Sequence, residues 1–123
     1  MSPESTTVRG RRAEDLARRH LEAQGLELLL ANYRCRAGEV DLVMLDGTTL
    51  VLVEVRSRTT STHGDAASTV GARKQQRLVR AARHLLLTHP QYRRLAARFD
   101  VVAIDPGPDG SPGLRWIRDA FRV

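Results

Sequence analysis

Charged residues recur at alternate positions in two neighbouring stretches of otherwise apolar sequence. Glu39 and Asp41 lie in the first stretch, and Glu54 and Arg56 lie in the second. Because side chains alternate between the two faces of a strand, all four share one face if the stretches pair as a hairpin. Two carboxylates about 5 Å apart repel by roughly 3 kcal/mol at an effective dielectric near 20. Either Arg56 and other arginines offset this repulsion in a structural ion-pair network, or a divalent metal does so, bound by carboxylates and a backbone carbonyl.

The turn between the two stretches predicts the hairpin. Asp46-Gly47 favours a tight type I′ turn, because both central residues of that turn need a positive φ. A two-residue loop places Asp41 opposite Leu52, whereas a four-residue loop places it opposite Glu54. The strands are predicted over residues 40–45 and 49–55, and their other face is expected to belong to the core through Val40, Leu42, Met44, Val51, Val53 and Val55.

Composition favours a single domain with a polyanionic partner. The chain has 123 residues, a formal net charge of +6 and a sequence pI of about 10.9. Nucleic acid is the usual partner of such a protein, and a membrane surface is the less usual one. Aromatic residues make up only 4% of the chain, which argues against binding by base stacking and favours contacts with phosphates.

Other features point to a soluble protein of the cytoplasm with no membrane partner. Cys35 is the single cysteine of the chain, so an intramolecular disulfide is excluded and a zinc site built from several thiolates cannot form. The first ten residues lack the apolar core of a secretory signal, and no stretch approaches the roughly 18 apolar residues of a membrane span. Residues 1–10 are expected to form a flexible N-terminal tail.

A first helix is predicted over residues 11–24, with Ala13, Leu16, Ala17 and Leu21 along its packing stripe. Glu14 lies beside that stripe. It is either an i,i+4 partner of Arg18 or an acid that belongs to the carboxylate site.

A second helix is predicted from a cap at Ser68 or Thr69 to about Thr88, before Pro90. Basic side chains recur along it at i, i+4, i+7 and i+11, and no acidic residue of the helix balances them. We therefore expect this ridge to contact nucleic-acid phosphates through Arg73, Arg77 and Arg80, with His84 at its end.

The remaining patterns complete an α/β domain over residues 1–123. Further strands are predicted at 26–35 and 98–105, a polar loop at 57–69, a turn-rich segment at 106–113 and a last strand or helical turn at 114–123. The order is helix, three strands, helix, strand and a last element. This order predicts a mixed central sheet flanked by helices.

Several short motifs, taken in this order, resemble the YraN-like family of uncharacterised bacterial proteins. They are Gly38-Glu39-Val40-Asp41-Leu42, Val53-Glu54-Val55-Arg56, Lys74-Gln75-Gln76-Arg77 and Arg98-Phe99-Asp100-Val101-Val102. The resemblance covers nearly the whole chain. That family is similar to restriction-endonuclease-like nucleases of the PD-(D/E)XK type, including archaeal Holliday-junction resolvases, which implies an αβββαβ core.

The resemblance also implies a metal site. Asp41 would be the first metal-binding carboxylate, Glu54 the second and the Val55 carbonyl a further ligand, with Glu39 and Glu14 as accessory acids. The expected cofactor is Mg²⁺ or Mn²⁺. Such an ion activates water for attack on a phosphodiester and neutralises charge on the transition state.

The chain departs from the nuclease signature at Arg56, where the pattern has lysine. A lysine can stabilise charge or, with a lowered pKa, help to deprotonate water, whereas arginine can do only the first. Lys74 is the only lysine among 20 basic residues and could supply the amine. Its other expected role is a phosphate contact.

We therefore predict a metal-dependent endonuclease that hydrolyses phosphodiester bonds in DNA, with DNA favoured over RNA as its partner and branched or junction DNA as candidate substrates. The alternative is a catalytically impaired nucleic-acid-binding module that keeps the nuclease fold. A homodimer is compatible with the resemblance, since enzymes that cut junctions commonly act on two strands.

Overall fold

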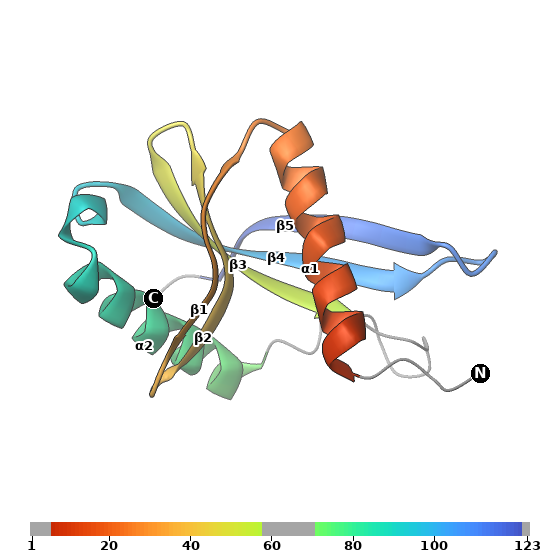
Figure 1. Ribbon diagram of the computed structural model, residues 1–123, viewed down its shortest axis with the longest axis horizontal. Helices are drawn as coiled ribbons and strands as arrows, with labels where there is room; N and C mark the ends of the chain where they lie inside the picture. The colour runs from red at the N-terminus through yellow and green to blue at the C-terminus, as the bar shows by residue number, and fades with distance from the viewer. Residues whose placement is uncertain (1–5, 58–70, 122–123) are drawn as a thin grey trace.

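The computed structural model describes residues 6–57 and 71–121, which form two helices packed on one sheet (Figure 1). The order of the long elements is α1 (Thr6–Ala23), β1 (Glu27–Cys35), β2 (Gly38–Asp46), β3 (Thr49–Ser57), α2 (Ala72–Thr88), β4 (Ala96–Pro106) and β5 (Pro112–Phe121). A short 3-10 helix, η2 (Pro90–Tyr92), follows α2. The predicted α/β class and αβββαβ order are confirmed, and the last element is a strand.

The sheet has five strands in the order β1-β2-β3-β4-β5. Strands β3 and β4 are parallel and all other neighbours are antiparallel. Parallel neighbours need a crossover connection, which α2 provides. The sheet is therefore mixed, as predicted.

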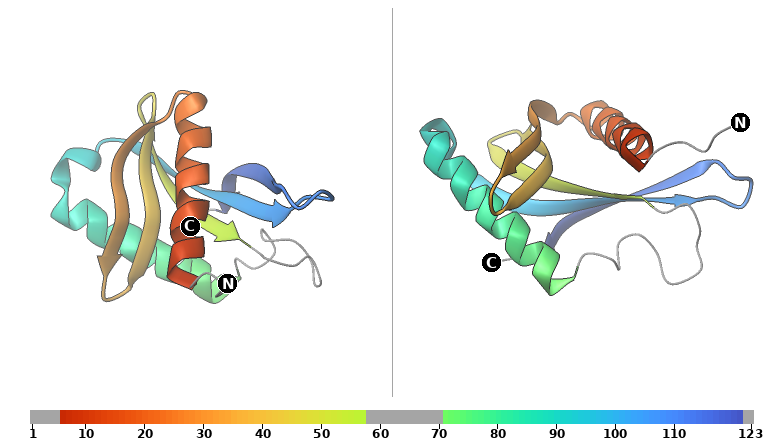
Figure 2. Two further views of the ribbon diagram at one scale, coloured as in Figure 1. Left: turned by 45° about the vertical axis from the view of Figure 1, so that its right-hand side comes forward. Right: turned by 60° about the horizontal axis from the view of Figure 1, so that its bottom comes forward.

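The two helices cover opposite faces of the sheet, as the right-hand view of Figure 2 shows. Helix α1 uses small residues for close packing, with Ala13, Ala17 and Leu21 buried against a core that includes Leu42, Met44, Val51 and Val53. Helix α2 buries Leu78, Ala81, Ala82 and Leu85 against Val43, Leu50, Leu52 and Phe99. Sheet strands covered on both faces are apolar on both faces, which explains the nearly continuous hydrophobic runs in β2 and β3.

Some predicted details of the helices are wrong. Helix α1 begins at Thr6, so residues 6–10 belong to it rather than to a flexible tail, and residues 1–5 lie outside the described part. Leu16 is 39% exposed because it lies about 100° around the helix from the centre of the alanine stripe. The N-cap of α2 is Gly71, not Ser68 or Thr69, and almost all of the predicted 57–69 loop lies outside the described residues.

The hairpin has the register of the four-residue-loop alternative, with Leu42 opposite Val53. One more pair, Asp46 with Thr49, forms beyond Leu45–Leu50, so only Gly47 and Thr48 remain in the loop. Asp46 is therefore a strand residue. The type I′ prediction had placed it at a central position of the turn, and that prediction is wrong. The Asp46 carboxylate also accepts a hydrogen bond from Arg98 Nη2 at 2.9 Å.

Val40 packs on the opposite face from the one predicted. It belongs to the α2-side core with Val43, whereas Leu42 and Met44 face α1. The pairing of β2 with β3 ends at Leu42, and β2 continues with β1 as a strongly twisted ribbon (Figure 2). Strict alternation between two faces fails where a strand leaves the plane of the sheet.

Neither helix in the described part of the chain is long and apolar enough to cross a membrane.

Candidate active site

The predicted carboxylate site lies where β2 separates from β3. Beyond the Leu42–Val53 pair, the Val55 backbone N–H donates to Asp41 Oδ2 at 2.8 Å. The side chain of Asp41 thus takes the place of a missing ladder acceptor. Because the N–H and C=O of one strand residue point to the same neighbouring strand, the Val55 carbonyl is directed to the same gap.

Glu54 is the buried member of the site. Its side chain is only 3% exposed, and its Oε1 lies 3.2 Å from Lys74 Nζ and 3.7 Å from Arg56 Nη1. Its Oε2 is buried and has no hydrogen-bond partner, the one such side-chain atom in the described parts of the chain. Burial, and next the charge of Asp41, raise the pKa of Glu54 to about 8, although Lys74 acts in the opposite direction.

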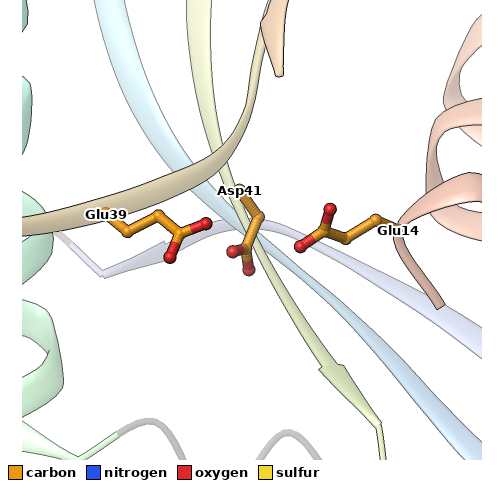
Figure 3. A group of neighbouring side chains, drawn as sticks. All are labelled: Glu14, Glu39 and Asp41. Carbon is orange, nitrogen blue, oxygen red and sulfur yellow. The ribbon is translucent and has the colours of Figure 1, made fainter. Parts of the chain in front are cut away.

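Three carboxylates meet at Asp41, the acidic neighbour of Glu54, and Glu54 itself is not a member of this group. Figure 3 shows Glu39 and Glu14 on either side of Asp41, the first from β2 and the second from α1. One carboxylate oxygen from each lies within 4.8 Å of the others. Burial raises the pKa of Asp41, and burial together with the charge of Asp41 raises the pKa of Glu14. Burial and mutual repulsion therefore make the ionised forms of these acids costly when no cation is bound.

The donor set fits a hard divalent cation. Carboxylate oxygens and a backbone carbonyl are the ligands that Mg²⁺ and Mn²⁺ prefer. An ion-pair network is also present. Lys74 and Arg56 approach Glu54, and Arg34 approaches Glu39 at 3.6 Å. That network provides no donor to Glu54 Oε2, and a buried carboxylate oxygen without a partner is costly when the group is ionised. In the metal-free protein a proton shared with the Asp41 carboxylate offsets this cost, whereas a cation at this position would allow both acids to ionise.

Elements far apart in sequence position these groups. Glu14 lies near the middle of α1, and Lys74 lies in the first turn of α2. The start of α2, the β1–β2 turn and the end of β3 all lie in the lower part of Figure 1. Gly38 permits the close approach of α2, because a Cβ on it would lie 3.2 Å from both the Cβ and the carbonyl oxygen of Arg77. Lys74, one helical turn before Arg77, is thereby brought to Glu54.

The other predicted residues lie on α2 and α1. Arg73, Arg77 and Arg80 are exposed on α2. His84, at the end of the ridge, forms a hydrogen bond with the Tyr33 hydroxyl of β1. Glu14 does not pair with Arg18, which instead contacts Glu22 at 3.1 Å, so Glu14 belongs to the carboxylate site.

The sequence analysis missed the contacts made by two residues, Asn32 and Asp100. Asn32, at a φ of 54°, forms a side-chain hydrogen bond with Glu14, and asparagine is one of the few residues that tolerate this backbone conformation. Asp100 is fully buried and accepts hydrogen bonds from Arg98 Nε, Trp116 Nε1 and the Asp119 N–H, at 2.9–3.2 Å. Asp100 occurs in a motif quoted above, but the sequence showed only a strand there.

The comparison with known proteins places the chain in a family. A family model described as "Uncharacterised protein family UPF0102" matches residues 13–104, which include every candidate site residue. The chain belongs to the UPF0102 family. This confirms the resemblance to YraN-like proteins that the motifs indicated.

Relatives match over almost their full length. The UPF0102 protein of Stutzerimonas stutzeri (strain A1501) is 51% identical over 112 residues, covering 91% of this chain and 92% of the relative. That of Pseudomonas aeruginosa (strain UCBPP-PA14) is 48% identical over 119 residues, covering 96% and 95%. That of Halorhodospira halophila is 47% identical over 126 residues, covering 99% and 97%.

Proposed function

We propose that this UPF0102 protein is a divalent-metal-dependent endonuclease that hydrolyses phosphodiester bonds in DNA, with branched DNA as a candidate substrate. The observation that carries the proposal is Glu54. Its carboxyl group is buried between Lys74 and the carboxylate of Asp41, with one oxygen that receives no hydrogen bond, and burial and the charge of Asp41 raise its pKa to about 8. Strongly perturbed acids in such clusters are typical of functional sites.

The residues have separate roles in this proposal. Asp41, Glu54 and the Val55 carbonyl would hold Mg²⁺ or Mn²⁺. Glu14 and Glu39, which lie on either side of Asp41, would be accessory acids. The bound ion would supply activation of a water molecule and neutralisation of charge on the phosphate. The Val55 N–H fixes the orientation of the Asp41 carboxylate, which keeps that carboxylate in place for binding.

Lys74 takes the part of the signature lysine. It lies closer to Glu54 than Arg56 does, at 3.2 Å against 3.7 Å, although it comes from α2 and not from β3. Both cations can stabilise charge on a phosphate at the site, but only an amine can also exchange a proton at neutral pH. This arrangement makes Arg56 compatible with catalysis.

The basic ridge of α2 would hold the nucleic-acid backbone. Arg73, Arg77 and Arg80 are exposed on the helix that also carries Lys74, so a backbone that follows these arginines leads to the carboxylates. Contacts to phosphates supply most sequence-independent affinity and make it fall with salt.

Cleavage assays test this function directly. Purified protein is incubated with Mg²⁺ or Mn²⁺ and with linear, flapped and four-way-junction DNA, and Asp41→Asn and Glu54→Gln are compared with the wild type. We expect metal-dependent cleavage that both variants lose and that Glu27→Gln, an exposed control on β1, retains. Absence of cleavage, together with DNA binding that ignores metal, would identify the protein as a binding module with the nuclease fold.

A second pair of variants tests the role of the amine. Lys74→Met is expected to lower the cleavage rate by about 100-fold or more, the low end of what a positioned proton-transfer group contributes. Arg56→Lys should preserve or increase the rate. If Lys74→Met cleaves as fast as the wild type while Arg56→Ala does not, Arg56 is the functional cation.

A further inference from the structure

A groove runs along the flank of α2 that faces the end of β5. It consists of two cavities, of about 560 Å³ and 430 Å³, which share Val79, Arg83 and Phe121 in their linings. The larger cavity extends over β3 and β4 to Leu50, Leu52 and Phe99. The smaller one extends toward the start of α2, past Gln75, Gln76 and Arg80. Volumes of this size accommodate small organic ligands.

The lining combines an apolar floor with a cationic rim. Phe121 stacks on Phe99, with ring centroids 4.8 Å apart and an interplanar angle of 18°. Arg80 and Arg83 are exposed along α2, and the side chains of Gln75 and Gln76 carry both hydrogen-bond donors and acceptors. Asp119 of β5 and Arg98 of β4 also line the larger cavity, but Arg98 is paired with Asp46 and Asp100. The exposed cations of the groove are therefore those on α2.

We propose that this groove binds an unpaired nucleotide of the nucleic acid whose backbone follows α2. The base would lie against Phe121 and the apolar floor, Gln76 would contact its polar edge, and Arg80 and Arg83 would contact its phosphates. The low aromatic content argues against stacking of successive bases, but one base needs only one ring. Unpaired bases are commonly bound on aromatic rings and guanidinium groups, whereas bases inside a duplex cannot reach such a site. The inference deepens the proposed function, because it rests on nucleic acid being the substrate.

Continuity with the basic ridge favours nucleic acid over an acidic peptide. Arg80 belongs both to the ridge of α2 and to the groove, so one backbone can contact the ridge and enter the groove. Lys74 is at the carboxylate site and Gln75, the next residue, lines the groove, so α2 lies between the two sites. A helix is about 10–12 Å across, so the unpaired nucleotide would not be the one whose phosphodiester bond is cleaved.

The test compares two DNA probes in metal-free buffer, where cleavage does not interfere. One probe is a continuous duplex, and the other is the same duplex with a five-nucleotide single-stranded flap, each labelled for fluorescence anisotropy. The wild type should bind the flapped probe about tenfold more tightly, within the range measured for stacking of one base on an aromatic side chain. Arg83→Gln and Phe121→Leu should each reduce this preference severalfold while binding the continuous duplex about equally well.

Controls separate the groove from general charge and from folding. Arg94→Gln removes an exposed arginine that does not line the groove, and it should keep the full preference for the flap. Arg83 is exposed on a helix, so Arg83→Gln reports on the groove even if Phe121→Leu loosens the contact with Phe99. Equal affinity of the wild type for both probes, or an unchanged preference in Arg83→Gln, would overturn the inference.

Two further measurements identify the source of the ligand. Thymidine monophosphate, added in millimolar excess, should not abolish the flap preference, and a result in which it does would assign the groove to free nucleotides. A flap preference without cleavage under any metal condition would refute the proposed nuclease and leave the groove assignment standing. Metal-dependent cleavage without any flap preference would support the proposed nuclease and refute the groove assignment.

Discussion

Replacing Glu54 by glutamine should stabilise the metal-free protein at alkaline pH. At about 1.4 kcal/mol per pKa unit, the rise from 4.5 to about 8 makes ionised Glu54 roughly 5 kcal/mol less favourable in the fold than in the unfolded chain. Glutamine has the shape of the protonated acid and no charge. Since whole domains are stable by only about 5–15 kcal/mol, this effect is large enough to measure.

The sign of the pH dependence follows from proton binding. Below about pH 4.5, Glu54 is protonated in both states, and above about pH 8 it is ionised in both. Between these values the fold holds a proton that the unfolded chain has released, so the free energy of unfolding falls as pH rises through this window. Wild-type protein should thus lose up to about 5 kcal/mol between pH 4.5 and 8, and Glu54→Gln should lack that part of the loss.

Urea denaturation in EDTA, from pH 4.5 to 8.5, measures the free energy of unfolding of the wild type and of the Glu54→Gln variant. We expect Glu54→Gln to exceed the wild type by about 3–5 kcal/mol at pH 8.5 and to be within about 1 kcal/mol of it near pH 4.5. Glu27→Gln, at an exposed position, should follow the wild type throughout. Mg²⁺ at 100 times its dissociation constant should stabilise the wild type by about 2.7 kcal/mol, and the Glu54→Gln variant should lack most of that gain.

The reasoning would be refuted if Glu54→Gln were no more stable than the wild type at pH 8.5 in EDTA. In that case Lys74 and Arg56 would already compensate the buried carboxylate, and the ion-pair network would account for the site without a metal.

Three other perturbations test the fold and the basic ridge. Arg77→Ala and Arg80→Ala should each weaken DNA binding and reduce the slope of log affinity against log salt by about 1, and an unchanged slope in titrations from about 50 to 200 mM salt would exclude a phosphate contact. Gly38→Ala should cost about 1–3 kcal/mol in urea denaturation, because its Cβ would press on the backbone of α2; equal stability would show that α2 moves away easily. Asp100→Ala should cost about 3–5 kcal/mol, since it leaves the partly buried Arg98 without its buried partner, and a loss under about 1 kcal/mol would show that Asp46 alone satisfies that arginine.

The apolar pattern of the chain was sufficient to predict the order of its elements. The nearly continuous apolar runs of β2 and β3 each describe one element and its own neighbours. So does the stripe of Leu78, Ala81, Ala82 and Leu85 in α2. The details that failed depend on other parts of the chain. Asp46 remains in its strand because it pairs with Thr49 and bonds to Arg98, 52 residues away.

The sequence by itself predicted that Glu39, Asp41, Glu54 and Arg56 lie in one region, because a short hairpin brings the ends of its two strands together. The alternation that assigned them to one face does not hold beyond Leu42, where β2 leaves the plane of the sheet. Only the tertiary structure decided that Glu14 faces Asp41 and that Lys74 lies 3.2 Å from Glu54. Helices α1 and α2 pack on opposite faces of the sheet, and no local pattern specifies which turn of each helix reaches the end of β3. Burial, which raises the pKa of Glu54 and leaves its Oε2 without a partner, likewise exists only once both helices and the sheet have packed together.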